Sequence, residues 1–189
     1  MLQKELSKVV LPVKEFVAKN YDGKPKIFQN LSAAEIAGLM KVKVTSLKSP
    51  IILSPSKLME GQSSLSFYNC AAIIPTLSAK GTAIFNSFYQ GATYPGVKVE
   101  FPKIAGKKYL VEFNVGLAHD IIYQFRITTP PGEINQDISV EGPQLTVLHA
   151  LVQPWDDYGG AFEVTIDQFN AADDFAGWAL YSVTITASS

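Results

Sequence analysis

Residues 109–115 read Tyr-Leu-Val-Glu-Phe-Asn-Val, and from Tyr109 every second side chain is large and apolar. Successive side chains of a β-strand point to opposite faces, so this stretch predicts a strand with one buried and one solvated face. The same period of two recurs from about residue 50 to the end of the chain. Its other apolar faces are Leu65 and Phe67; Ile121, Tyr123, Phe125 and Ile127; Leu145, Val147, His149 and Leu151; Phe162, Val164 and Ile166; and Tyr181, Val183 and Ile185.

Glycine and proline separate these runs, for example at Pro95-Gly96, Gly142-Pro143 and Gly159-Gly160. The spacing predicts some nine to eleven short strands, and no helical pattern lies between them after residue 60. Strands with one dry and one wet face are typical of antiparallel sheets that share a core. We therefore predict a mostly β fold, a two-sheet antiparallel β-sandwich of jelly-roll type with an α-helical N-terminal extension.

The first 48 residues follow a helical period instead. Leu2, Leu6 and Val9 begin an apolar stripe that Pro12 should kink. A second helix is predicted from Ser32, which can cap it while Glu35 reaches back in a capping box. We expect residues 1–48 to form a helical extension that packs on the sandwich and residues 49–189 to form the sandwich domain.

Composition excludes several classes of protein. The 189 residues carry a net charge of −1, and Arg126 is the only arginine, which argues against a nucleic-acid partner. Cys70 is alone, so no intrachain disulfide forms. No apolar run approaches the ~20 residues of a transmembrane segment, and no signal peptide is visible. The compartment is unknown, although the low charge of 17% favours an extracellular or cell-surface location over the cytoplasm.

Two further segments carry a resemblance to known proteins. Gly106 to Phe113 enters a middle strand, and Trp178 to Ile185 closes the chain. Together with the strand pattern of residues 50–189, they resemble jelly-roll carbohydrate-binding modules and galactose-binding-like domains. The resemblance implies glycan binding and often a structural calcium ion. It matches no defined motif, so it transfers no binding residue to this chain.

An acidic, aromatic segment is the candidate ligand site. It reads Trp155-Asp156-Asp157-Tyr158-Gly159-Gly160. Sugars stack their apolar faces on flat rings, and carboxylates accept hydrogen bonds from sugar hydroxyls. We predict that Trp155, Asp156, Asp157 and Tyr158 bind a ligand, with a glycan as the leading candidate. An ordinary solvated turn anchored by Trp155 would have the same composition.

A second acidic segment is the candidate metal site. Asp173 and Asp174 supply the oxygen ligands that calcium prefers, although a solvated turn uses them equally well. The function requires no cofactor, and calcium is the ion that these residues would hold. A strand separates the two acidic segments, so they should lie at opposite ends of the sandwich unless the chain bends.

These observations predict a non-catalytic, carbohydrate-binding module that uses loops at one end of the sandwich. The alternative is a self-associating structural protein such as an appendage, capsid or coat component. A carboxylate-based hydrolase is the lesser alternative, because two carboxylates can suffice for glycoside hydrolysis. The common catalytic motifs are missing from the sequence, and His119 and His149 are its only histidines, so we expect no enzyme activity.

Overall fold

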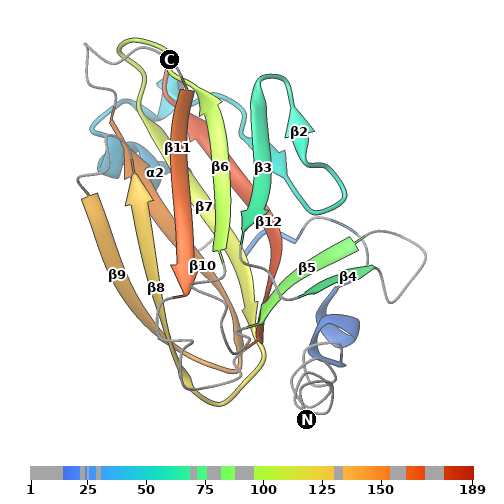
Figure 1. The fold of residues 1–189 in the computed structure, drawn as a ribbon. Helices are drawn as coiled ribbons and strands as arrows, with labels where there is room; N and C mark the ends of the chain where they lie inside the picture. Colours follow the sequence, from blue (N-terminus) through green and yellow to red (C-terminus); the bar gives the residue numbers. More distant parts are fainter. Residues whose placement is uncertain are drawn as a thin grey trace.

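The computed structural model of this protein shows two sheets packed face to face (Figure 1). It describes residues 15–21, 24, 26–28, 31–68, 72–75, 82–87, 96–129, 134–153, 161–168 and 177–189.

The first sheet is built around its longest strand. This strand, β12, pairs with β7 along most of its length, with β5 at its start and with β1 near its end, always antiparallel. The strand order is β10-β7-β12-β5-β4, with β1 beside β12. The strands are β1 (Ile51–Leu53), β4 (Ala72–Pro75), β5 (Thr82–Ser87), β7 (Tyr109–Leu117), β10 (Gln144–Val152) and β12 (Gly177–Ala187).

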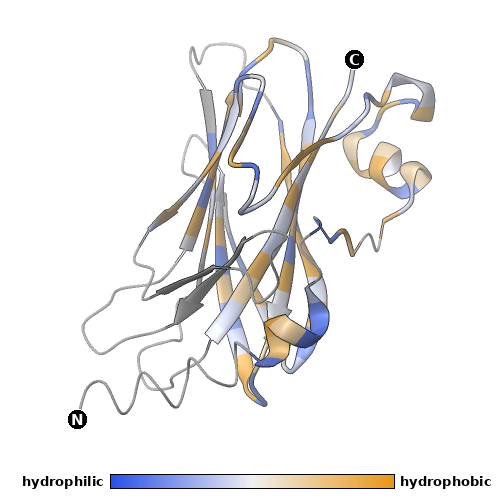
Figure 2. Cartoon of the chain, turned by 90° about the vertical axis from the view of Figure 1, so that its right-hand side faces the viewer, coloured by the Kyte–Doolittle hydropathy of each residue, from blue (hydrophilic) through white to orange (hydrophobic). Residues whose placement is uncertain are grey.

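The second sheet is also antiparallel and has the order β2-β3-β6-β11-β8-β9. Figure 2 shows the two sheets edge-on, as the layers of a sandwich. The predicted fold class, a mostly β two-sheet antiparallel sandwich, is therefore confirmed. The strands are β2 (Met59–Glu60), β3 (Ser63–Tyr68), β6 (Gly96–Pro102), β8 (Ile122–Thr129), β9 (Ile134–Glu141) and β11 (Ala161–Gln168).

The main core lies between the sheets. The predicted apolar faces of β7 and β8 supply it, and Phe113 and Phe125 are fully buried there. Trp178 of β12 is also fully buried, as predicted, with its ring at 86° to that of Phe125 and the two centroids 5.2 Å apart. Burying one such side chain stabilises the fold by roughly 1.5–3 kcal/mol.

The outer face of the first sheet is covered rather than solvated. Helix α2 (Ala33–Met40) starts with the predicted capping box, in which the Glu35 N–H donates to Ser32 Oγ and the Ser32 N–H donates to the Glu35 carboxylate. Its buried residues Ile36 and Met40 pack on Leu110 of β7. A short 3₁₀ turn, η1 (Val44–Ser46), follows. The helical extension is small, and α2 lies outside the sandwich in Figure 2.

A second part of the N-terminal segment covers the same face. Residues 15–20 are helical, and Val17 and Tyr21 pack against Tyr181 of β12. The Phe28 N–H donates to Asn114 Oδ1 at 2.5 Å, and Ser182 Oγ donates to the Lys26 carbonyl at 2.5 Å. The prediction that the polar face of β12 is solvated was wrong, because these contacts bury it. The residues concerned are Ser182, Thr184 and Thr186.

Two strand faces also differ from the prediction. In β10, the residues that enter the core are Leu148, Ala150 and Val152, whereas His149 is exposed on the outer face. In β12, a bulge between Leu180 and Ser182 shifts the register, so that Tyr181 packs outside the sheet while its predicted partners Val183 and Ile185 stay in the core. An extra residue in one strand reverses the side-chain alternation beyond it.

Candidate functional site

The predicted ligand residues Trp155 to Tyr158 lie outside the described residues, but the strands on either side are well placed. Strand β10 reaches this segment from Val152, which pairs with Tyr109. Strand β11 leaves it at Ala161, which pairs with Pro102. The segment therefore joins the two sheets at the end where β6 finishes and β7 begins, which is the upper end in Figure 1.

The candidate metal ligands Asp173 and Asp174 also fall outside the described residues. Their segment starts after Gln168, which pairs with Phe125, and ends before Trp178, which pairs with Leu117. Leu117 is the last residue of β7, whereas Tyr109 is the first. The two acidic segments are thus attached to opposite ends of the sandwich, which argues against one site built from both.

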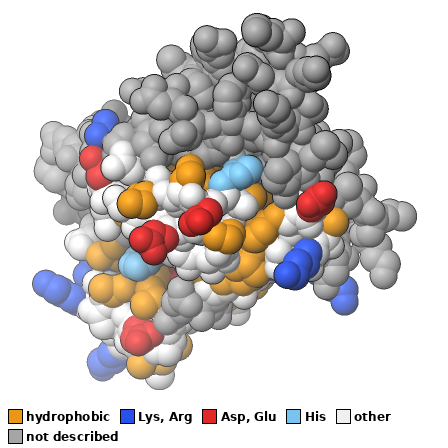
Figure 3. Space-filling model, turned by 90° about the horizontal axis from the view of Figure 1, so that it is seen from below, with side chains coloured by type: hydrophobic (Ala, Val, Ile, Leu, Met, Phe, Trp, Pro, Cys, Tyr) orange, Lys and Arg blue, Asp and Glu red, His pale blue; other side chains and the backbone are white. Residues whose placement is uncertain are grey.

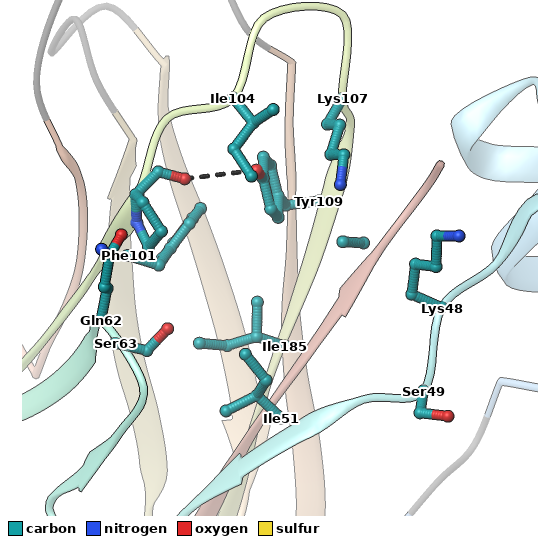
Figure 4. Close-up of a pocket in the computed structure, with 12 residues that line it drawn as sticks. Lys48, Ser49, Ile51, Gln62, Ser63, Phe101, Ile104, Lys107, Tyr109 and Ile185 are labelled. Atoms are coloured by element: carbon teal, nitrogen blue, oxygen red, sulfur yellow. Dashed lines mark hydrogen bonds between the residues drawn. The ribbon is translucent and has the colours of Figure 1, made fainter.

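A pocket opens at the end where the predicted ligand segment is attached. It lies between the end of the first sheet and the edge of the second, and its volume is about 320 Å³. This value falls near the lower limit of small-molecule pockets, roughly 300–1,000 Å³. Figure 4 shows the side chains that surround it. The lining residues are Lys48, Ser49, Ile51, Gln62, Ser63, Phe101, Pro102, Ile104, Lys107, Tyr109, Ile185 and Ala187.

Apolar side chains form the walls of the pocket. Ile51 of β1 and Ile185 of β12 lie on one side in Figure 4, and Phe101 of β6 lies opposite. The rings of Phe101 and Tyr109 pack at 50° with centroids 4.9 Å apart. Ile51, Ile185 and Tyr109 come from the paired strands β1, β12 and β7 of the first sheet, whereas Phe101 comes from β6 of the second sheet, so the pocket is held between the two sheets.

The polar groups of the pocket are hydrogen-bond donors and acceptors around these walls. The Tyr109 hydroxyl donates to the Pro102 carbonyl at 3.2 Å, which holds the ring across the loop between β6 and β7. Burial raises the pKa of the Tyr109 phenol, so the ring stays neutral at physiological pH. Gln62 and Ser63 come from the turn between β2 and β3, and the Ser63 hydroxyl points inward in Figure 4.

Lys48 and Lys107 are the charged residues among the twelve that line the pocket. Lys107 comes from the β6–β7 loop, and its side chain extends toward the cavity in Figure 4. Lys48 precedes β1, and its N–H donates to the Ala187 carbonyl at 2.9 Å. Among the described residues, the lining contains two cations and no carboxylate, so this part of the pocket is electropositive.

The outer face of the second sheet is a poorer candidate. Near the centre of this face, Lys98 forms ion pairs with Glu100 at 3.1 Å and with Glu163 at 3.3 Å. Hydrogen bonding to Lys98 lowers the pKa of Glu100, and the Arg126 guanidinium lowers the pKa of Asp137 in the same way. The outward residues of β6 and β8 include no aromatic ring on which a sugar could stack, and the half-buried Tyr68 of β3 packs against Gly96 of β6.

Metal and catalytic sites find little support in the described part of the chain. It contains no group of three or more histidine, cysteine, aspartate and glutamate side chains that could hold a metal ion. Burial lowers the pKa of His119, and its Nε2 atom is buried without a partner. His149 is exposed on β10. Among the described helices, none is long and apolar enough to span a membrane.

Sequence analysis missed every residue of this pocket. Its walls come from strand positions that sequence analysis assigns to the core, and its charged residues stand far apart in the chain. A usable signal was present: residues 41–48 and 103–108 each contain three lysines and no acidic residue. Only the pairing of β1 with β12 and of β12 with β7 brings the two segments to one end.

Comparison with known proteins finds only distant structural similarity. No family model matches this chain, and no curated protein matches its sequence. Similar solved structures include a CBM35 module from Cellvibrio japonicus, with a TM-score of 0.44 and 10% identity over 72% of this chain and 92% of that chain. The CBM22-1 xylan-binding domain of Paenibacillus barcinonensis has a TM-score of 0.43 and 12% identity over 74% of this chain and 94% of that domain.

A GH115 4-O-methyl-alpha-glucuronidase is also similar, with a TM-score of 0.46 and 10% identity. The match covers 71% of this chain but only 17% of that enzyme. Carbohydrate-binding modules thus occur among the similar structures, in agreement with the resemblance noted in the sequence. The identities and TM-scores are too low to transfer a ligand or a site residue, so the argument for function rests on the pocket.

Proposed function

We propose that this protein is a non-catalytic binding module that recognises a glycan at the pocket end of the sandwich. The most direct support for this proposal is that the pocket and the predicted ligand segment are attached to the same end of the sandwich. Tyr109 and Pro102, which line the pocket, are the strand partners of Val152 and Ala161, which border the aromatic and acidic segment. The pocket and the segment whose side chains suit sugar binding were identified independently. Both are therefore attached to the same end of the sandwich.

The chemistry of the two features is complementary. A sugar presents apolar C–H faces and a rim of hydroxyls. The isoleucine and aromatic walls of the pocket suit the faces, and Gln62 and Ser63 suit the hydroxyls. Trp155 and Tyr158 would add stacking surfaces, with Asp156 and Asp157 accepting hydroxyl hydrogens. A calcium ion at Asp173 and Asp174 would lie at the far end and serve structure rather than binding.

The test is a glycan array followed by calorimetric titration of the best ligand. We expect Trp155→Ala to weaken binding about tenfold, equivalent to ~1.4 kcal/mol, with an unchanged melting temperature. Ile122→Ala is the matched control, because Ile122 is 54% exposed at the start of β8, at the opposite end. Its affinity should equal that of the wild type.

The opposite results have clear meanings. Unchanged affinity of Trp155→Ala would remove the segment from the site. No binding to any glycan, together with a mass that grows with concentration in light scattering, would replace the proposal with a self-assembling structural protein. A strict monomer at high concentration would argue against assembly.

A further inference from the structure

Two basic stretches of the chain supply residues to the pocket. The chain has almost equal numbers of basic and acidic residues, 16 and 17. Between Glu35 and Glu60, however, all the charged side chains are lysines, and the same is true between Glu100 and Glu112. The lysines in these two stretches are Lys41, Lys43, Lys48, Lys57, Lys103, Lys107 and Lys108.

Hydrogen bonds hold these two stretches together across the end of β12. Lys108 Nζ donates to the Met40 carbonyl at 2.6 Å. The Ser188 N–H donates to the Lys108 carbonyl at 2.9 Å, and Leu47 forms a bridge with Ser188. The lysines that are distant in the chain are therefore near neighbours at one end of the fold.

No described carboxylate neutralises the two lysines that line the pocket. On the second sheet, Lys98 is paired with two carboxylates, and Lys57 is paired with Glu60 at 2.9 Å. Lys48 and Lys107 form no ion pair with any described residue. Figure 3 shows the opposite end of the molecule, where acidic and basic side chains both lie among hydrophobic ones. At the pocket end, the two described charged residues of the lining are both lysines.

We propose that the pocket selects an acidic glycan, with a carboxylated or sulfated sugar unit whose anionic group contacts Lys107 and Lys48 and whose ring lies against Ile51 and Ile185. This assignment rests on the proposed function and specifies its ligand class. A charged donor such as lysine strengthens a hydrogen bond to an anion.

A nucleic acid fits this end less well than an acidic sugar. Arginine makes the commonest specific contacts to phosphate and bases, and Arg126 lies on the second sheet, paired with Asp137 at 2.8 Å. The pocket is also compact, about 320 Å³, and its apolar walls suit one sugar ring rather than a run of stacked bases. Single-stranded DNA is therefore included as a competing ligand in the test.

The test compares ligands that differ only in charge. Trigalacturonate is titrated beside its methyl ester, and dextran sulfate beside dextran, so that carboxylate and sulfate are distinguished. The variants are Lys107→Gln, Lys48→Gln and the double variant. Lys19→Gln is the matched control, because it removes one positive charge from an exposed site at the opposite end. Calorimetry at two salt concentrations gives the affinities.

We expect the acidic ligand to bind at least tenfold more tightly than its neutral partner. Lys107→Gln should reduce that preference about fivefold and the double variant about tenfold, whereas Lys19→Gln should leave it unchanged. Equal binding of acidic and neutral ligands would overturn the acidic assignment while leaving the proposed function in place. No binding to either would overturn both. Equally tight binding to DNA, or an equal effect of Lys19→Gln, would show nonspecific attraction of polyanions and also overturn the assignment.

Discussion

Glu112 tests the energetic cost of ionising a buried carboxyl group, because its side chain is buried on the outer face of the first sheet. Its side chain is 1% exposed, and neither Oε1 nor Oε2 has a hydrogen-bond partner. On β7 it lies between Leu110, which packs under α2, and Asn114, which binds the Phe28 N–H. Its cross-strand partners are His149 on β10 and Thr184 on β12, and the buried hydroxyl of Thr184 is also unpartnered.

Burial raises the pKa of the Glu112 carboxyl above its ordinary value of 4.5. The folded protein therefore holds this proton more tightly than the unfolded chain does. The contribution of Glu112 to the free energy of unfolding is therefore largest below pH 4.5, falls as pH rises from there through the raised pKa, and is level above it. Glutamine has the same shape and does not titrate, so Glu112→Gln should abolish this fall.

The expected size follows from the cost of an unsatisfied buried polar group, about 1–3 kcal/mol, and more for a charged one. We expect Glu112→Gln to raise the free energy of unfolding by at least about 1 kcal/mol at pH 8, which is about 2–4 °C in melting temperature. At pH 4 the two proteins should differ little, because protonated glutamate and glutamine are both neutral.

The assay is urea unfolding from pH 4 to pH 8. Glu141→Gln is the control, because Glu141 is exposed at the end of β9. Its effect on the free energy of unfolding should be small at every pH. A Glu112→Gln protein no more stable than the wild type at pH 8 would refute the argument. So would an equal gain at every pH, since that would point to packing rather than ionisation.

Two further predictions test the sheets. Gly96→Ala should lower the free energy of unfolding by about 1–3 kcal/mol, because a Cβ atom there would lie 2.6 Å from the Ile166 carbonyl oxygen and meet the Tyr68 ring. Thermal unfolding measures this loss of stability. Gly38→Ala in α2 is the comparison, because a Cβ atom there meets nothing within 4 Å, and it should instead stabilise the protein by roughly 0.5–1 kcal/mol. Asp137→Asn should cost under about 1 kcal/mol in urea unfolding, because the Arg126–Asp137 pair is 43% and 50% exposed; a larger loss would contradict the weak value of exposed ion pairs.

Alternation of residue type predicted the fold because most strands have one face in the core. Phe113 and Phe125 lie where the period placed them, and Trp178 is buried as expected. The capping box at Ser32 is similarly local, since the residues that form it are three apart. Features that depend on neighbours in sequence were therefore predictable.

The errors arose where both faces of a strand are buried. Strand β10 has Leu148 and Ala150 in the core, yet Leu145 and Leu151 on its outer face also pack against the N-terminal segment. When both faces are apolar, the pattern no longer tells which one faces the core. The bulge beside Tyr181 leaves no sign in residue types, because a bulge is a property of pairing with another strand.

The boundary near residue 48, the ligand residues Trp155 to Tyr158 and the metal ligands Asp173 and Asp174 remain predictions. The structure contributes their setting, through the strand ends that border the two acidic segments. It adds the pocket, which combines Lys48, Phe101 and Lys107 from three separate stretches of the chain.

The sequence by itself determined the strand period, the antiparallel sandwich class and the cap of α2, because each depends on side chains only a few positions apart. The tertiary structure alone decided which faces are covered and which residues share the pocket. Pairing of β12 with β7 and β1 brings Lys48 and Lys107 together, and the N-terminal segment buries Glu112. These contacts depend on strand pairing and packing between residues far apart in the chain, which the pattern of neighbouring residue types does not predict.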